Sequence, residues 1–487
     1  MDHGCAFAHQ HLCDVGRTST RVLAIWDQDP SPEFDPARGS RPKVAGLQYG
    51  RQMDRAALKT YLGAGSDREV YRAARYSALE NDFTHGTLTL GLLAGQYLSP
   101  SLAQGSGLGE LKAGQDMDDV DIVFVQIPRA VGMCPSRGAI DRISYDALRY
   151  MLACAQNGSD VVVVLDYGTE LGPHDGSSWF ERAVDQLVSW AKNKHGIRLK
   201  VVFPSGNSHD DQRHAKMKFV AAGTTSSVYL DVPYGNGAAA STEIWFPPKM
   251  QAFMVSVTAP GHTIPVQLAL TPGIGPLVSA FAGGTLTVTL QNGQPCVLLE
   301  VGATETIPSL AGRWCIGIFS PKAQQAPVCL YTAWGGRNPG FVQRLWPCRF
   351  ESAQIETQDI LPTMDGSGSL LGSACGQSTT MVGGYEKWRP HYRAAYSGGG
   401  PARGGRHAVR GADVLCVVNE VSSLPGVLTM GAVSGPWYRA SGTSFAAPQW
   451  ARAWLSPPLA YQGVLPLPPP YFGISQLRSE YGEPRLL

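Results

Sequence analysis

The stretch Ser441-Gly442-Thr443-Ser444-Phe445-Ala446-Ala447-Pro448 decides how the rest of the chain is interpreted. Ser444 lies between small residues and precedes an apolar run with helical spacing. This pattern predicts a helix that begins near the serine. At such a position the backbone N–H is free to bond an oxyanion, and the helix dipole favours developing negative charge. Ser444 is therefore a candidate nucleophile.

Length and composition set the broad class of the protein. The 487 residues are too many for one hydrophobic core and predict two or three domains. A formal net charge of +1 gives no electrostatic reason to expect a nucleic acid or a membrane surface as a partner. The first residues, Met1 to Cys5, lack a basic segment followed by an apolar one, so we expect no signal peptide and a cytoplasmic location. The alternative is a secreted form from which a signal and pro-segment have been removed.

The ten cysteines are scattered from Cys5 to Cys416 without a Cys-x-x-Cys pair. This distribution argues against both a zinc site and a disulfide framework. We expect reduced thiols.

Two earlier segments carry side chains that could serve Ser444. The apolar run Arg21 to Trp26 predicts a buried strand that ends on Asp27-Gln28-Asp29-Pro30, and sites in open α/β sheets are built at that end of a strand. A turn or cap is the commoner fate of a lone aspartate. Further on, His85-Gly86-Thr87 opens a run of small and apolar residues, which predicts a buried helix with His85 at its mouth.

These segments resemble the motifs of the subtilisin-like serine proteases (subtilases). His85-Gly86-Thr87 is similar to the histidine motif of that family, and Gly442-Thr443-Ser444-x-Ala446-x-Pro448 to its serine motif. The chain order Asp27, His85, Ser444 is also that of the family. Its aspartate is usually followed by Ser or Thr and then Gly, and Asp27-Gln28 departs from this pattern. Asp29 is the fallback, and Asp27 is favoured because it directly follows the strand.

The middle of the first half alternates strand and helix. Strands are predicted at 122–127, 161–165 and 201–203, with one helix capped by Ser144 and the next by a capping box from Ser178 to Glu181. The fold class expected is α/β. In the family it is a doubly wound, mostly parallel sheet flanked by helices.

Two loops after these strands extend the resemblance. Ser205-Gly206-Asn207 is similar to the motif whose asparagine donates to the oxyanion, and Asp166-Tyr167-Gly168 aligns with the segment that pairs with extended substrate. By resemblance, the substrate-binding residues expected are Asp166, Tyr167, Gly168, Ser205, Gly206 and Thr443. An aspartate at 166, where the family usually has serine, either favours basic substrates or is simply bonded within its loop.

From about Gly223 the sequence consists of short β-prone segments separated by Gly and Pro, which predicts an antiparallel β-sandwich. Some bacterial members of the family carry a jelly-roll-like domain in this interval. The expected division is 1–221 for the first part of the catalytic domain and 222–367 for the inserted β-sandwich. Residues 368–487 form the second catalytic part, with a proline-rich tail from Pro457 to Pro470.

The resemblance implies a serine endopeptidase that acts on protein or peptide substrates without a cofactor. Asp27, His85 and Ser444 would form the triad, and Asn207 with the Ser444 N–H would hold the oxyanion. Two alternatives fit the same motifs: a silent pseudoprotease whose β-domain binds partners, and a peptide ligase or macrocyclase. Only 26 residues precede Asp27, which leaves no room for the usual pro-segment.

The acidic group Asp116, Asp118, Asp119 and Asp121 could bind Ca²⁺, as some members of the family do, but it lacks the spacing of a known Ca²⁺ loop. We expect solvated charges there, and no metal is predicted.

Overall fold

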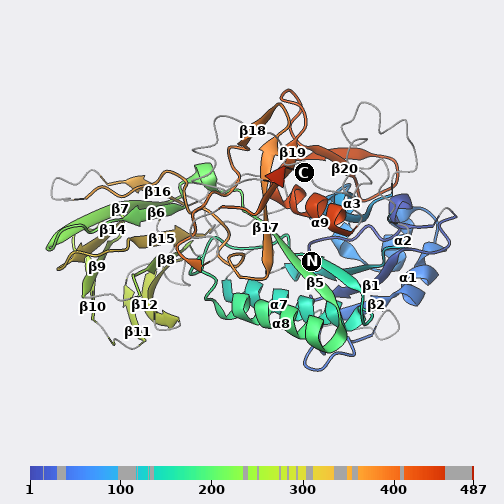
Figure 1. The fold of residues 1–487 in the computed structure, drawn as a ribbon, viewed down its shortest axis with the longest axis horizontal. Helices are drawn as coiled ribbons and strands as arrows, with labels where there is room; N and C mark the ends of the chain where they lie inside the picture. The colour runs from blue at the N-terminus through green and yellow to red at the C-terminus, as the bar shows by residue number, and fades with distance from the viewer. Residues whose placement is uncertain are drawn as a thin grey trace.

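A computed structural model of the chain describes most of the sequence. The described residues are 1–14, 16–29, 40–79, 81–96, 117, 119–129, 131, 137–233, 240–248, 252–271, 273, 276–281, 284–291, 294–302, 311–333, 348–353, 360–405, 411–455 and 485–486. The expected tail from Pro457 to Pro470 and the expected solvated charges of Asp116 and Asp118 lie outside them. The structure has an α/β part and a part made of strands alone, which lie at opposite ends of the long axis (Figure 1).

The main sheet of the α/β part is built from segments far apart in the sequence. Its strand order is β22-β19-β17-β5-β4, and every neighbouring pair in that order is parallel. The bounds are β4 Asp160–Val164, β5 Arg198–Pro204, β17 Thr379–Glu386, β19 Val414–Asn419 and β22 Arg485–Leu486. β18 (Arg389–Arg393) pairs with β17 in antiparallel fashion. Parallel strands need crossover connections, and the longest of these, from β5 to β17, contains the whole all-β part.

A second sheet has the order β2-β1-β3, formed by β1 (Val22–Asp27), β2 (Arg51–Asp54) and β3 (Ile122–Gln126). β1 and β3 are parallel. The first two residues of the chain lie between this sheet and the main one. The Met1 amino group donates to Val164 O of β4 at 2.8 Å, and Asp2 N donates to Val125 O of β3 at 3.0 Å. Asp2 therefore sits in the position of a strand between β3 and β4.

Helices cover the main sheet on both faces. α7 (Arg137–Cys154) and α8 (Trp179–His195) lie on one face, while α3 (His85–Ala94) and α9 (Ala447–Leu455) lie on the other (Figure 1). Two shorter helices, α1 (Arg55–Leu62) and α2 (Asp67–Ala73), flank β1 and β2. One face of the sheet packs into a core with α7 and α8, and the other packs against the alanines of α9.

The start of α8 agrees with its prediction. Ser178 and Glu181 form the expected capping box, and Gly196, with φ +66°, ends the helix in a left-handed conformation. The prediction that Ser144 begins a helix is wrong. α7 begins at Arg137, and Ser144 is buried within it. Ile140 and Ile143 are also buried, so the apolar stripe of the helix extends before the serine.

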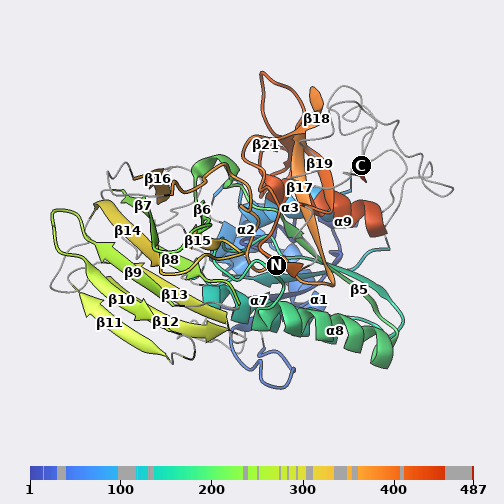
Figure 2. The ribbon, with the colours of Figure 1, turned by 60° about the vertical axis from the view of Figure 1, so that its left-hand side comes forward.

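The all-β part, which we call the β-domain, consists of two antiparallel sheets with the orders β10-β9-β14-β7-β16 and β11-β12-β13-β8-β15-β6 (Figure 2). Apolar side chains from both sheets share one core, which includes the fully buried Leu230, Ile244 and Trp314. The strands of the first sheet are β7 Thr224–Val232, β9 Phe253–Thr258, β10 Val266–Leu270, β14 Gly312–Ser320 and β16 Arg349–Ser352. Those of the second are β6 His214–Met217, β8 Ala240–Trp245, β11 Leu277–Phe281, β12 Gly284–Gln291, β13 Gln294–Val301 and β15 Val328–Thr332.

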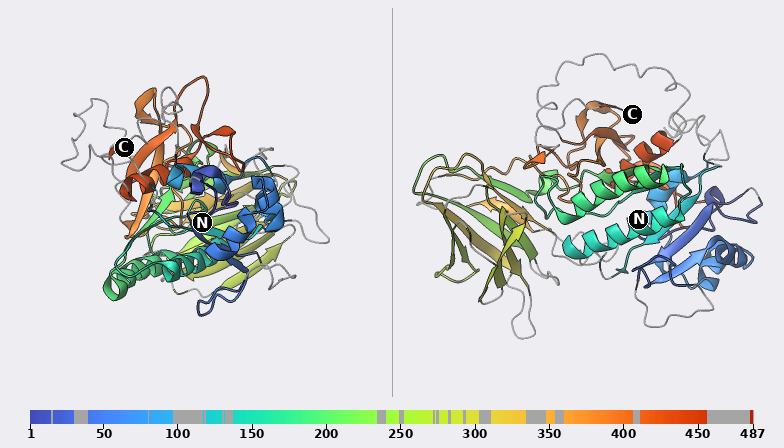
Figure 3. Two further views of the ribbon diagram at one scale, coloured as in Figure 1. Left: turned by 90° about the vertical axis from the view of Figure 1, so that its right-hand side faces the viewer. Right: turned by 60° about the horizontal axis from the view of Figure 1, so that its bottom comes forward.

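The β-domain begins before the boundary expected between 221 and 222. β6 precedes that boundary but pairs with β15 along its length, so it belongs to the second sheet of the β-domain. The β-domain projects from one side of the α/β part (Figure 3). A stack of three rings lies between the two parts: Tyr331 of β15 is sandwiched between His174 at 3.7 Å and His214 at 4.4 Å, measured between ring centroids.

Three further observations concern the described residues alone. They contain no helix that is both long enough and apolar enough to cross a membrane. Their cysteines all have free thiols. They hold no group of three or more His, Cys, Asp or Glu side chains arranged to bind a metal, and Asp121 of the acidic group forms an ion pair with Arg55.

Candidate active site

His85 is the first residue of α3, and tight backbone packing fixes its position. The Thr84 side chain caps the helix by accepting from Thr87 N. Gly86 N donates to His3 O at 2.8 Å, and a Cβ on Gly86 would lie 2.6 Å from Gly4 O. Gly4 itself has φ +87°, and a Cβ there would lie 2.2 Å from the Thr84 hydroxyl. Both glycines are needed for the start of α3 to lie directly on residues 3 and 4.

This packing brings Asp2 against the imidazole of His85. Both carboxylate oxygens of Asp2 are 2.8 Å from His85 Nδ1. The carboxylate also accepts from the Thr89 hydroxyl at 2.9 Å and from His3 N at 2.6 Å, and the residue is only 2% exposed. These bonds hold the carboxylate in one orientation, and the carboxylate in turn fixes the ring of His85.

The prediction that Asp27 orients His85 is wrong in this structure, and Asp2 takes that place. Asp27 ends β1, in register with Gln126 of β3, and Asp2 is in register with Gln126 from the other side. β3 therefore lies between the two carboxylates, and their backbones are two strand spacings apart, about 9–10 Å. The Asp27 carboxylate accepts from Asp29 N at 3.1 Å, which makes it a local turn bond and also places the fallback residue Asp29 on that side of β3.

The two carboxyl groups also differ in electrostatics. Burial alone would raise the pKa of Asp2, but the charge and hydrogen bond of His85 outweigh burial and hold it below its ordinary value. Burial would lower the pKa of His85, and the Asp2 carboxylate outweighs this and raises it above 6.5. Among the described residues no histidine bonds Asp27, and burial, offset only in part by the Asp29 N–H and the Arg51 charge, raises its pKa to about 6. The Asp2 carboxylate therefore stabilises the protonated form of the His85 imidazole, which is what a histidine that accepts a proton during a reaction requires.

Ser444 lies in a 3₁₀ turn (η6, Thr443–Phe445) that leads directly into α9. It is 8% exposed. The Phe445 ring that follows it lies 5.4 Å from the His85 ring, centroid to centroid. The main sheet positions this segment, because Ala446, Ala447 and Ala451 pack on valines of β4, β5, β17 and β19. The expected helix start near Ser444 is present, with the 3₁₀ turn preceding the α-helix.

Asn207 follows β5 and lies beside the serine segment. Its Oδ1 accepts from Thr443 N at 2.9 Å and from the Thr443 hydroxyl at 3.0 Å. Because both donors bond the same end of the amide, that end is the oxygen and the other end is the donor Nδ2. The Asn207 side chain is exposed. A Cβ built on Gly442 would lie 3.5 Å from this Nδ2. The amide is therefore held against the loop that carries Ser444.

The expected substrate-binding residues fall into two groups. Ser205 and Thr443 are completely buried, and the Thr443 hydroxyl ties the two loops together by bonds to Gly206. Their side chains therefore support the loops. The segment Asp166 to Gly168 follows β4 and lies beside His85, with the Tyr167 ring 5.8 Å from the His85 ring, centroid to centroid.

The side chain of Asp166 is buried, with one carboxyl oxygen that makes no hydrogen bond to any described residue. Burial and the nearby Asp2 carboxylate raise its pKa to about 8. Asp166 is therefore a neutral acid over much of the pH range in which Asp2 is charged.

Sequence reasoning missed Asp2 and Thr89. A signal for Asp2 was present, because Asp2-His3-Gly4 has the Asp-x-Gly pattern that Asp27-Gln28-Asp29 lacks. It was overlooked because no apolar strand precedes Asp2, whereas one precedes Asp27. Thr89 had no local signal, since its role depends on the helical turn that places it above Asp2.

The fold is similar to that of a solved protease structure. The solved structure of the CspB protease of Clostridium perfringens matches with a TM-score of 0.65, over 93% of this chain and 80% of that chain, at 16% sequence identity. At that identity the similarity concerns the fold. No protein-family profile and no curated protein sequence matches the chain.

Proposed function

We propose that the chain is a serine endopeptidase of the subtilisin-like type, with a jelly-roll-like β-domain inserted in a doubly wound α/β domain. The observation that carries the proposal is the Asp2–His85 pair, with both carboxylate oxygens 2.8 Å from Nδ1, beside the segment that bears Ser444. The protease fold of the structural neighbour supports it. Substrates would be proteins or peptides.

Each residue has a role in acyl transfer. His85 takes the proton of the Ser444 hydroxyl as the oxygen attacks the peptide carbonyl, and later returns it to the leaving amine. Asp2 keeps the proton of the resting imidazole on Nδ1, so that Nε2 is the base, and stabilises the imidazolium that forms. Asn207 Nδ2 and the Ser444 N–H donate to the oxyanion. No described residue is required to hold a cofactor for this chemistry.

The proposal is tested by labelling with a fluorophosphonate probe, followed by digestion of a peptide library. We expect the wild-type protein to be labelled, and Ser444→Ala and His85→Ala to lose labelling and about 10⁶ in turnover. Ser159→Ala, at a surface turn serine whose hydroxyl bonds Gln156 O, is the matched control and should behave as wild type. Labelling that persists in Ser444→Ala, or a wild-type protein that is neither labelled nor active, overturns the proposal. Product masses distinguish hydrolysis from ligation.

A further inference from the structure

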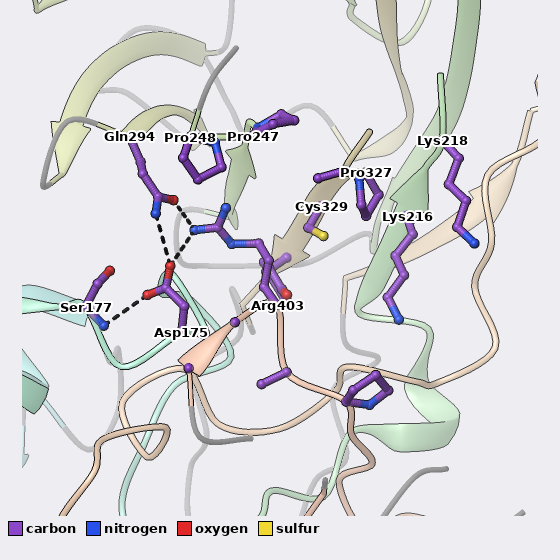
Figure 4. A pocket seen from close by; sticks show the side chains of 16 residues that line it. Asp175, Ser177, Lys216, Lys218, Pro247, Pro248, Gln294, Pro327, Cys329 and Arg403 are labelled. Atoms are coloured by element: carbon purple, nitrogen blue, oxygen red, sulfur yellow. Dashed lines mark hydrogen bonds and ion pairs between the residues drawn. The ribbon is translucent and has the colours of Figure 1, made fainter. Parts of the chain in front are cut away.

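A cavity of about 520 Å³ lies where the β-domain meets the α/β domain (Figure 4). The β-domain contributes residues from β6, β13, β15 and the segment after β8, and the α/β domain contributes the loop before α8 and the loop at 401–405. The volume is within the range of small-molecule sites, which occur preferentially at domain interfaces. None of Asp2, His85, Asn207 and Ser444 lines it.

One wall of the cavity is a closed polar cluster around Arg403. Its guanidinium donates to Pro173 O at 2.8 Å, to Phe246 O at 3.3 Å and to Asp175 at 3.0 Å, and also bonds Gln294. It also lies over the Trp245 ring, 5.0 Å from the centroid. Each of its three nitrogens therefore donates to a group of one of the two domains. Arg403 and Asp175, both of the α/β domain, neutralise each other, and each also bonds Gln294 of the β-domain across the junction.

The opposite wall carries two ammonium groups. Lys216 and Lys218 are two residues apart on and just after β6, so they share one face, and Figure 4 shows both side chains extending in the same direction. Lys216 Nζ donates to the Ser367 hydroxyl at 2.7 Å, and that hydroxyl in turn bonds Asp365. Within the part of the chain that the structure describes, neither ammonium lies within ion-pair distance of a carboxylate. The Asp365 carboxylate acts on Lys216 through Ser367, and the two ammonium groups together still leave an excess of positive charge on this wall.

The remaining surface of the cavity is largely apolar. Most of it is formed by the Tyr331 ring and by the proline and alanine side chains of Pro247, Pro248, Ala326, Pro327, Pro401 and Ala402, and Ser177 is a polar residue among the rest. Rigid apolar walls with a few convergent cations are the composition of a site for a molecule with an anionic end and an apolar body. A cluster of exposed lysines without such walls would bind anions without selecting those that have an apolar body.

We propose that this cavity binds a small organic anion, whose carboxylate or phosphate group contacts the ammonium groups of Lys216 and Lys218 and whose apolar portion packs on the proline wall and Tyr331. Burial lowers the pKa of Lys216, and an anion beside the ammonium group raises it. Because both domains line the cavity and Tyr331 stacks between His174 and His214, an occupant stabilises the junction.

The test is calorimetric titration of the full chain with two probes, phenyl phosphate and 3-phenylpropionate, which separate the two kinds of anionic group. We expect at least one of them to bind, and the Lys216→Met, Lys218→Met double variant to lose about tenfold or more in affinity. Lys59→Met, which removes one charge from the exposed face of α1, should bind as wild type. Lys218→Arg should retain binding.

Lys218→Gln alone provides a second arm if the double variant does not fold, because Lys218 is exposed. The Ser444→Ala protein should bind the probes as the wild type does, which makes this test independent of the proposed peptidase activity. Absence of binding by both probes at millimolar concentration overturns the proposal. Affinity unchanged by both Lys218→Gln and the double variant overturns it as well.

Discussion

Asp2 and Asp27 lie on either side of β3, both in register with Gln126, and their surroundings have opposite effects. Asp2 is bonded to His85, Thr89 and the backbone, and its pKa is held below the ordinary value. Asp27 accepts one backbone N–H, and burial raises its pKa to about 6. The difference shows that position relative to β3 decides which carboxylate can orient His85. Only the carboxylate on the edge of β3 where α3 begins reaches the imidazole.

The largest expected difference is in catalysis. Asp2→Asn should lower kcat by about 10⁴, because the amide no longer stabilises the imidazolium or holds the useful tautomer. Asp27→Asn should leave kcat and KM within a few-fold of wild type. Steady-state kinetics on one peptide substrate measures both. Equal losses in the two variants would remove the distinction between the carboxylates.

Asn207→Ala gives an intermediate point on the same scale. Loss of one oxyanion donor costs about 10²–10³ in kcat, which is less than the loss expected for Asp2→Asn and far more than that for Asp27→Asn. KM should change little, because the bond is made in the transition state. Unchanged turnover would exclude Asn207 from the site.

Gly86→Ala tests the packing that delivers Asp2 to His85. The added Cβ would meet Gly4 O at 2.6 Å, so the start of α3 must move away from residues 3 and 4. We expect kcat to fall by about 10–10², the cost of a displacement of about 1 Å. Gly138→Ala in α7 is the matched control, because its Cβ would meet nothing within 4 Å. If the two variants have equal activity, the contact does not position His85.

The smallest expected effect is on stability, and it is specific to Asp27. Its pKa is 3.8 when unfolded and about 6 when folded, so the folded state binds more protons between these values and stability falls as pH rises through that window. Asp27→Asn removes this penalty and should stabilise the protein at pH 7 by about 1–3 kcal/mol. Urea unfolding at pH 4 and pH 7 measures it. A variant that is less stable at pH 7 would contradict the conclusion that desolvation of the partly buried Asp27 carboxyl outweighs its bond to Asp29 N.

Features that depend on neighbouring residues could be predicted from the sequence. The capping box of α8 was predicted because Ser178 and Glu181 contact each other within one turn. The β-prone segments expected after about Gly223 likewise form antiparallel strands. His85 and Ser444 could be placed at helix starts for the same reason.

Features set by distant contacts could not be predicted. The pairing of β6 with β15 assigns residues 214–217 to the β-domain, and nothing in their own sequence indicates it. The choice of Asp2 over Asp27 depends on which side of β3 the start of α3 packs, a contact between residues 83 positions apart. Ser144 is a suitable cap by its chemistry, but packing continues α7 beyond it.

The most direct test of the account is a proton NMR spectrum that detects the Nδ1–H of His85, since a hydrogen bond to a carboxylate moves this proton far downfield. We expect the wild-type protein and Asp27→Asn to show the same downfield signal, and Asp2→Asn and His85→Ala to lack it. A signal that survives in Asp2→Asn and disappears in Asp27→Asn would contradict the account.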